Sequence, residues 1–239
     1  MTGAEMKIPT PEELEAMLAR GELKRIGDGS RRICYAIGDS GLCLKGYRRE
    51  EDLDSRMRPD GSLETHPLKS STVREIRAAR FDERKNTSCQ EWRSYQELKA
   101  KLPQELFASF PETLERVLVP SFGWCLVENL IVNADGSPVQ KFAPVYRNAD
   151  ESLKKRLLAV LLALRDGLMR HAVRFYDPQN VMVQFAADGS FRLRIIDFEP
   201  ATRTWIPIDT LLPALTRRKC ARRFRRFITE SLHVKGAVE

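Results

Sequence analysis

A glycine-punctuated run near the N-terminus constrains the fold of this chain more than any other feature. Residues 23–47 read LKRIGDGSRRICYAIGDSGLCLKGY, in which short apolar runs alternate with glycine and polar residues. Apolar runs of this length between turn residues are typical of strands in a tight antiparallel meander. We therefore predict three strands, near 23–27, 32–37 and 41–46.

The rest of the chain alternates helical and strand-like patterns. Thr10, Pro11 and Glu13 predict a helix at about 11–20, because they supply a capping hydroxyl, a first-turn proline and a carboxylate that caps back. A helix is expected over about 88–101, and a largely buried helix begins after Ser152. Strands are expected in VLVPSF, WCLVENLIV, VMVQF and FRLRIID, and the end of the chain, 209–232, reads as helical.

One segment shows neither the helical nor the strand periodicity of apolar residues. Residues 48–71 are rich in Arg, Asp, Glu, Ser, Pro and Gly, with few apolar positions at helical or strand spacing. Such composition is typical of an irregular surface segment. We predict a long, mobile insertion there.

Composition excludes several classes of protein. Hydrophobic residues make up 42% of the chain and charged residues 31%, as in globular proteins. No apolar run approaches the roughly 20 residues of a membrane span, and the N-terminus lacks the pattern of a signal peptide, so a cytoplasmic location is expected. The five cysteines form no C-x-x-C pair, so neither a disulfide framework nor a zinc site is indicated.

Positive charge is concentrated near the C-terminus. The net charge is +7, and one short stretch holds seven basic residues: Arg217, Arg218, Lys219, Arg222, Arg223, Arg225 and Arg226. This cluster predicts contact with an anionic surface, and the alternative is a solvated helix face that keeps the protein soluble. Phe224 and Phe227 interleave with the arginines, but their spacing favours core packing over base stacking, so nucleic acid is a disfavoured partner.

Two polar side chains bracket the second predicted hairpin. Asn180 precedes VMVQF, and Asp197 follows the apolar run LRII. A metal ion that bridges two phosphates needs hard oxygen ligands on rigid supports, and an amide and a carboxylate at strand ends supply them. Asn180 and Asp197 are therefore the predicted ligands of Mg²⁺, although Asp197 alone could equally be a cap or turn residue.

The order of these features resembles the protein-kinase-like fold. The resemblance implies an α+β, two-lobed single domain over 1–239, with a small antiparallel N-lobe sheet in 1–126 and a mainly helical C-lobe in 130–239. It implies ATP and magnesium as cofactors, and Lys45 at the lysine that contacts the phosphates. I-D-F-E, ending at Glu199, resembles the choline-kinase and aminoglycoside-phosphotransferase branch.

The same resemblance assigns the remaining nucleotide contacts. Glu91 is the expected partner of Lys45, with Glu75 as its rival. Gly27 and Gly29 match part of the phosphate-binding glycine loop, but a G-x-G pair more often only closes a hairpin. The hinge that would meet the adenine base is expected at Val127, Glu128 and Asn129, through backbone groups.

The catalytic loop departs from the kinase pattern. The base aspartate should lie five residues before Asn180, and Phe175 occupies that position. Asp177 is the candidate replacement, and its alternative role is to begin a turn before Pro178. Loss of the base need not abolish transfer, because the transition state depends mainly on positioning and charge neutralisation.

A narrower resemblance is to the PhoP regulatory network protein YrbL family, a bacterial kinase-like group. The stretches that carry it are GDGSRRICYA, LCLK, CQEWRSYQEL, NADGSP, PQNVMVQ and, by pattern only, IPIDTLLPALTRRKCARRFRRFI. Three functions are consistent with the sequence. The chain is expected to be a slow phosphotransferase acting on a small molecule or an envelope glycan or lipid precursor. The alternatives are a pseudokinase that only binds nucleotide, or a binder of nucleic acid or anionic surfaces through residues 217–226.

Overall fold

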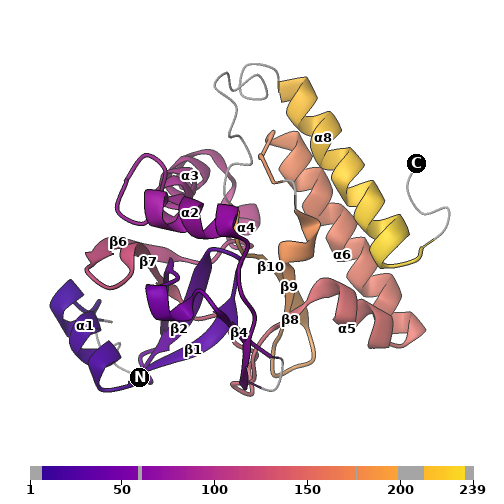
Figure 1. Ribbon diagram of the computed structural model, residues 1–239. Helices are drawn as coiled ribbons and strands as arrows, with labels where there is room; N and C mark the ends of the chain where they lie inside the picture. Colours follow the sequence, from indigo (N-terminus) through magenta and orange to yellow (C-terminus); the bar gives the residue numbers. More distant parts are fainter. Residues whose placement is uncertain (1–6, 59–60, 176, 199–212, 235–239) are drawn as a thin grey trace. The chain divides into compact units, whose positions relative to one another are not determined.

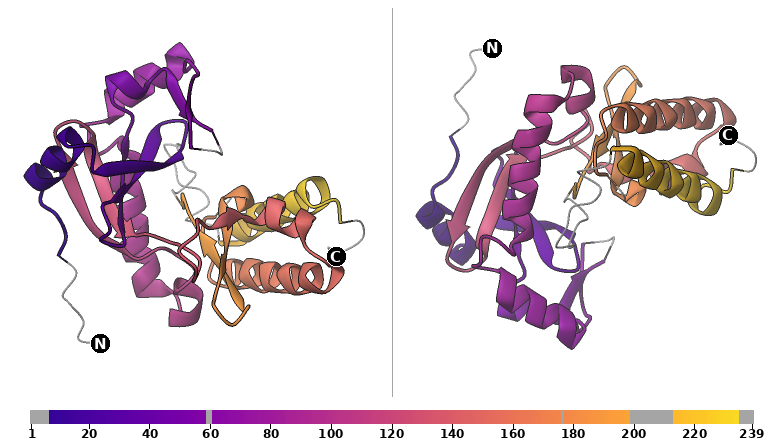
Figure 2. Two further views of the ribbon diagram at one scale, coloured as in Figure 1. Left: turned by 90° about the horizontal axis from the view of Figure 1, so that it is seen from below. Right: turned by 90° about the horizontal axis from the view of Figure 1, so that it is seen from above.

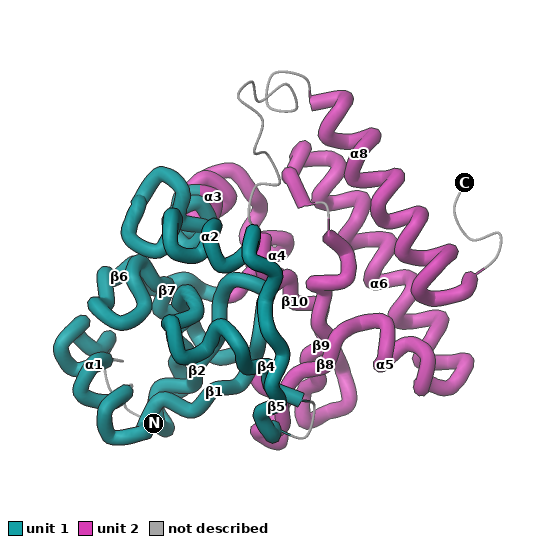
Figure 3. The backbone as a smooth tube through the Cα atoms, in the orientation of Figure 1, with its two compact units in different colours: residues 1–93, 112–130 teal, residues 94–111, 131–239 magenta. Residues whose placement is uncertain are grey.

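The computed structural model describes residues 7–58, 61–175, 177–198 and 213–234. The chain divides into two compact units, coloured separately in Figure 3. Unit 1 comprises residues 1–93 and 112–130, and unit 2 comprises 94–111 and 131–239. The predicted lobes were 1–126 and 130–239, so residues 94–111 fall in a different unit from the expected one. The reason is packing, because Tyr95 and Phe110 are buried in the apolar core of unit 2.

Unit 1 contains one five-stranded antiparallel sheet, in the order β1-β2-β3-β7-β6 (Figure 1). The predicted meander forms its first three strands. The helices and strands are α1 (Pro11–Ala19), β1 (Leu23–Asp28), β2 (Arg32–Ile37), β3 (Leu42–Tyr47), α2 (Ser70–Ala79), α3 (Thr87–Lys101), β6 (Thr113–Val119) and β7 (Gly123–Asn129). Thr10 and Glu13 form the predicted capping box at the start of α1.

The two faces of this sheet differ because side chains alternate along each strand. Ile33, Leu42 and Leu44 point to one face, where they form an apolar core with Leu14 of α1. The register pairs Cys34 with Lys45 and Cys43 with Glu128, so these side chains share the opposite face. The sheet therefore buries a set of polar and ionisable side chains on its second face.

The segment 48–71 has more structure than the sequence predicted. It contains the short helix η1 (Glu50–Asp52) and a two-stranded sheet formed by β4 (Ser55–Met57) and β5 (Leu63–Thr65). Part of its order comes from contacts with β1, because Arg25 donates to Ser55 Oγ and the N–H of Met57 donates to Asp28. Contacts between residues far apart in the sequence leave no periodic pattern, so the sequence of this segment predicted an irregular structure.

Unit 2 combines helices with a three-stranded sheet in the order β10-β9-β8. Besides the end of α3, its elements are α4 (Gln104–Phe107), β8 (Gln140–Lys141), α5 (Phe142–Asn148), α6 (Glu151–Arg170), η2 (Pro178–Asn180), β9 (Val181–Phe185), β10 (Phe191–Ile195), α8 (Pro213–Arg226) and the π-helical turn η3 (Phe227–Ser231). Helices α6 and α8 pack side by side, as both views in Figure 2 show.

The expected secondary structure of unit 2 is present where the structure describes it. The long helix and the β9–β10 hairpin were both predicted, and residues 209–212 of the expected last helix lie outside the described residues. Among the described helices, none is long and apolar enough to cross a membrane. The architecture is α+β, with a small antiparallel sheet and helices, and is compatible with the kinase-like fold that the sequence predicted.

Candidate functional site

A buried ion pair joins the sheet of unit 1 to α3. The Nζ atom of Lys45 lies 3.0 Å from Oε1 and 3.1 Å from Oε2 of Glu91, and the side chain of Glu91 is fully buried. Lys45 reaches Glu91 because it points to the polar face of β3. The rival carboxylate, Glu75, pairs instead with Arg31 at 2.9 Å. The structure thus brings together Lys45 and Glu91, the two residues that the sequence paired.

Arg32 is a member of this cluster that the sequence analysis missed. Its Nη1 donates to Oε2 of Glu91 at 2.6 Å, and its side chain is 7% exposed. Two cations therefore share one buried carboxylate, which fixes both of them in position. The alternation of side chains along a strand could have revealed it. Arg32 lies two residues before Cys34 and therefore on the same face of β2, and Cys34 pairs with Lys45.

Glu128 lies on the same polar face, at the end of β7. Its carboxylate accepts a hydrogen bond from Thr113 Oγ1 at 3.0 Å. Burial, opposed by Lys45 and reinforced by the charge of Glu91, raises the pKa of Glu128 to about 7. A hydrogen bond with Cys34, together with burial, likewise raises the pKa of Cys43. The carboxyl of Glu128 and the thiol of Cys43 therefore keep their protons to a higher pH than usual.

The glycine hairpin closes on itself. Gly27 pairs with Cys34 beside a bulge in β1. The N–H of Gly29 donates to the carbonyl of Arg32 at 2.8 Å, and its carbonyl accepts from Arg48 Nη2 at 3.0 Å. The N–H of Gly29 is therefore already used within the hairpin, and a phosphate contact at Gly27 stays a prediction. Hairpin closure, the alternative reading of the sequence, describes this turn.

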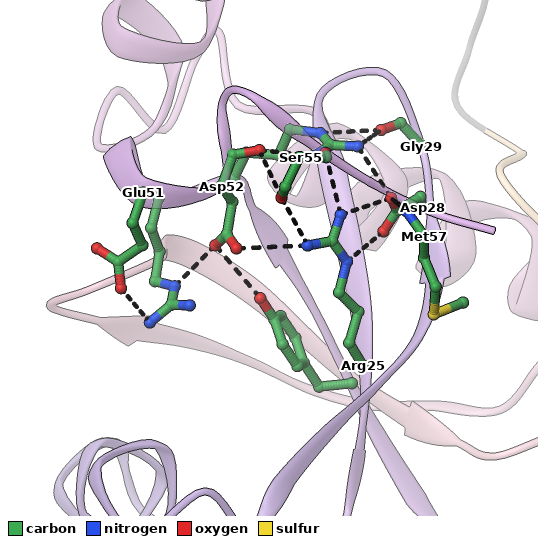
Figure 4. Close-up of polar contacts among 10 residues, drawn as sticks. Arg25, Asp28, Gly29, Glu51, Asp52, Ser55 and Met57 are labelled. Atoms are coloured by element: carbon green, nitrogen blue, oxygen red, sulfur yellow. Dashed lines mark hydrogen bonds and ion pairs between the residues drawn. The ribbon is translucent and has the colours of Figure 1, made fainter. Parts of the chain in front are cut away.

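A network of arginines and aspartates clamps that hairpin to the segment 48–57 (Figure 4). Asp28 accepts hydrogen bonds from Arg25 at 2.6 and 2.5 Å and from the N–H of Met57 at 2.6 Å. Arg25 also donates to Ser55 Oγ at 2.9 Å and lies 3.5 Å from Asp52. Although burial opposes ionisation, the bonds from Arg25 and Met57 lower the pKa of Asp28. The clamp holds the position of the turn next to β2.

The predicted hinge residues lie inside the sheet. Glu128 is paired with Cys43 on one side and Thr113 on the other. The N–H of Asn129 donates to the carbonyl of Glu112 at 2.9 Å, so it is not open to a base. The N–H of Asn129 is thus engaged within the sheet, and an adenine contact through the rest of this backbone stays a prediction. The side chain of Asn129, unlike its backbone N–H, keeps one unused group. Its Oδ1 is buried without a hydrogen-bond partner, while its Nδ2 donates to Glu112.

Within unit 2, the hairpin brings Asn180 and Asp197 close in space. Val181 pairs with Ile195, and the carbonyl of Asn180 accepts from the N–H of Ile196 at 3.0 Å. The two predicted ligands thus flank the same end of the hairpin. Asp197 has a positive φ of 52°, a left-handed conformation that aspartate tolerates better than most residues. Backbone strain of this kind accumulates at functional sites.

The loop before Asn180 is built as a packing and turn element. Phe175 is 2% exposed and packs against Phe224, with ring centroids 6.1 Å apart. Asp177 is exposed and caps η2, accepting from the N–H of Gln179 at 3.3 Å. The preceding Arg174 has Nε and Nη2 buried without hydrogen-bond partners. The kinase base position is therefore a core position here, and Asp177 adopts the turn role that the sequence left open.

Comparisons with known proteins add little to this description. No family model matches the chain, and no curated protein matches it in sequence, so neither comparison supports the resemblance to the YrbL family. Among solved structures, the chain is similar to PpkA-294 in its apo form, at 14% identity and a TM-score of 0.44. The match covers 87% of this chain and 62% of that chain, so the chain spans less than two thirds of its length.

Proposed function

We propose that this protein binds a nucleoside triphosphate, ATP in the first instance, together with Mg²⁺. The observation that carries the proposal is the buried group of Lys45, Arg32 and Glu91. Glu91 holds the Lys45 ammonium at 3.0 Å on the polar face of the sheet, and Arg32 adds a second cation at 2.6 Å from the same carboxylate. A cation fixed in a poorly solvated setting interacts with phosphate more strongly than one in water.

The donor set in unit 2 suits Mg²⁺. An amide oxygen from Asn180 and a carboxylate from Asp197 are hard ligands, and Mg²⁺ keeps several waters, so two protein ligands and phosphate oxygens suffice. The backbone bond from Ile196 to Asn180 keeps the two residues at one end of the hairpin. Within the described part of the chain there is no group of three or more metal-binding His, Cys, Asp or Glu side chains. Mg²⁺ held mainly by substrate oxygens is therefore the kind of metal site that these residues fit.

Asn129 is the proposed contact for the base, through its side chain. Its Oδ1 atom is a buried acceptor without a donor, and the exocyclic amino group of adenine is such a donor. Guanine presents a carbonyl oxygen at the equivalent position. The proposal therefore includes a preference for ATP over GTP.

Binding is tested by titration calorimetry with ATP and Mg²⁺ on the full chain. Lys45→Met is expected to weaken ATP binding by about 10- to 100-fold, as expected when a charge-assisted contact worth about 1.5–3 kcal/mol is lost. Lys24→Met is the matched control, because Lys24 lies exposed in the same sheet. Equal affinities for the two variants, or no heat with the unaltered chain, would refute the proposal.

The metal contact is tested separately through unit 2. Asp197→Asn is expected to abolish the effect of Mg²⁺ on ATP affinity, and Asp188→Asn, in an exposed turn, is expected to leave it unchanged. The melting temperature of each variant, compared with that of the unaltered chain, separates loss of the metal contact from a fold defect. A Mg²⁺ effect that survives in Asp197→Asn would remove Asp197 from the site.

Whether phosphate is transferred is a second question. A specific observation favours a site that binds nucleotide without turnover, called here a silent site. Phe175 fills the base position and belongs to the core, while Asp177 is engaged at the start of η2. General-base help is worth about 10²–10⁴ in rate, so turnover through positioning alone would be slow. The second candidate function is therefore that of a pseudokinase, whose nucleotide biases the conformation a partner binds.

Release of phosphate from ATP over hours separates the two candidates. A slow enzyme that uses Asp177 would lose its turnover in Asp177→Asn, since the amide cannot accept the proton. Turnover that is absent in the unaltered chain, with ATP binding intact, would establish the silent site. Turnover unchanged in Asp177→Asn would exclude Asp177 as the base.

A further inference from the structure

Positive charge is concentrated on α8. Its fourteen residues read PALTRRKCARRFRR and contain seven basic side chains and no acidic one. That equals the net charge of the whole chain, +7. The helix is therefore a local source of positive potential rather than part of an evenly mixed surface.

The spacing of α8 separates a core face from a basic face. Thr216, Cys220 and Phe224 recur every four residues and are buried against the rest of unit 2. Arg218, Arg222 and Arg225 recur at i, i+4 and i+7 and are all exposed. Positions with this spacing lie on one side of a helix, so the three guanidinium groups form a stripe turned away from the core.

No described carboxylate neutralises the charges of this stripe. In the portion of the chain that the structure describes, no carboxylate pairs with Arg218, Arg222 or Arg225. Arg226 has a partner, Glu230, at 2.8 Å in an exposed pair. Like charges one helical turn apart repel each other, so the stripe is destabilising for the isolated helix. A bound anionic surface would relieve this repulsion.

An apolar recess adjoins the stripe. It has a volume of about 340 Å³ and is lined by Met169, Ala214, Leu215, Arg217, Arg218 and Ala221. Leu215 is 40% exposed, and Arg217 is held at the rim because its Nε donates to the carbonyl of Met169 at 3.1 Å. Cations and apolar carbon are therefore presented together, as on surfaces that meet amphiphiles.

We propose that this face of α8 binds the surface of an anionic phospholipid bilayer. Arg218, Arg222 and Arg225 would lie among the lipid phosphates, and Leu215 at the boundary between headgroups and acyl chains. Guanidinium groups suit phosphate because they offer paired donors. Single-stranded nucleic acid is less suited, because Phe224 and Phe227 are buried and no aromatic side chain of α8 is free to stack on bases. The apolar face of α8 is buried in the core, so the association would be peripheral and reversible.

The test is co-sedimentation of the full chain with vesicles of phosphatidylcholine, with and without phosphatidylserine. Binding is expected only with the anionic lipid and is expected to weaken as salt is raised. The triple variant Arg218→Gln, Arg222→Gln, Arg225→Gln is expected to lose about 100-fold in partitioning, because each basic residue near such a surface contributes roughly fivefold. The matched control is Arg20→Gln, Arg58→Gln, Arg77→Gln, which removes the same charge from exposed side chains of unit 1.

A second variant distinguishes a bilayer from any other polyanion. Leu215→Ser is expected to weaken vesicle binding several-fold and to leave binding to heparin unchanged, because only the bilayer offers an apolar layer. Equal loss in the two triple variants, binding to neutral vesicles, or tighter binding to duplex DNA than to vesicles at equal phosphate would each overturn the proposal. None of these measurements depends on nucleotide, so they succeed or fail independently of the proposed function.

Discussion

The polar face of the sheet in unit 1 and the exposed face of α8 in unit 2 use positive charge in opposite ways. On the sheet, Lys45 and Arg32 are buried and share the Glu91 carboxylate at 3.0 and 2.6 Å. On α8, Arg218 and Arg222 are exposed and have no carboxylate partner among the described residues. A buried charge raises the free energy of the folded state unless it is paired, whereas an exposed charge is hydrated and screened by salt at little cost in stability. The buried cations are therefore fixed in position, and the exposed ones act at a distance.

The largest effect is expected where a buried partner is removed. Glu91→Ala leaves Lys45 and Arg32 without their shared carboxylate, so the free energy of unfolding should fall by about 3–5 kcal/mol. Urea denaturation measures this change. Glu105→Ala, in an exposed turn of α4, is the control and should change stability by less than about 0.5 kcal/mol. A small effect of Glu91→Ala would mean that the cations are solvated, and the contrast with α8 would disappear.

The pH dependence of stability sharpens the same comparison. The pKa of Glu128 rises from 4.5 to about 7 in the folded protein, chiefly through burial. The folded state therefore keeps a proton that the unfolded state has lost, so this stabilisation is complete below about pH 4.5. It disappears as the pH rises through about 7, with a loss on the order of 3 kcal/mol.

Glu128→Gln isolates this contribution, since the amide oxygen keeps an acceptor for Thr113 and cannot ionise. The difference in unfolding free energy between the two proteins, measured from pH 4.5 to 8, should grow with pH in favour of the variant. Parallel pH profiles would show that Glu128 is not ionising in this range.

The clamp around Asp28 should give an intermediate effect. Asp28→Ala removes the acceptor for Arg25 and for the N–H of Met57, both at 2.6 Å or less. Leaving these partly buried donors without partners should cost about 2–3 kcal/mol. Amide hydrogen exchange should accelerate in residues 48–57 more than in α1. Uniform acceleration across unit 1 would indicate a global loss of stability rather than release of the clamp.

The sequence was sufficient for elements whose signals are local. The strands over 23–47, the capping box at Thr10 and the leucine-rich α6 all have short-range patterns, and the structure contains them. The segment 48–71 was read as irregular because its order depends on contacts with residues such as Arg25 and Asp28, about thirty positions earlier. Long-range charge pairing has no period, so no pattern in the sequence reveals it.

The candidate site shows the same division. Lys45 and Glu91 were paired by a resemblance that fixes their order along the chain, and their side chains do meet. Arg32 was missed because only Gly27 and Gly29 were considered in this hairpin, although strand alternation places Arg32 on the same face as Lys45. The N–H groups of Gly29 and Asn129 were expected to be open, but each is used in a hydrogen bond to a carbonyl. Which backbone groups remain free is decided by tertiary contacts, which a sequence does not display.

The smallest effect is expected on α8, and it is informative because of its sign. Replacing Arg218, Arg222 and Arg225 with Gln removes exposed like charges one turn apart, so stability in low salt should change by no more than about 0.5 kcal/mol and in the favourable direction. Salt screens the same repulsion, so the gain should vanish at high ionic strength. Thermal unfolding of both proteins across a salt series measures this. A destabilised triple variant would mean that these arginines make contacts that hold α8 in the fold, and the two regions would then use charge in the same way.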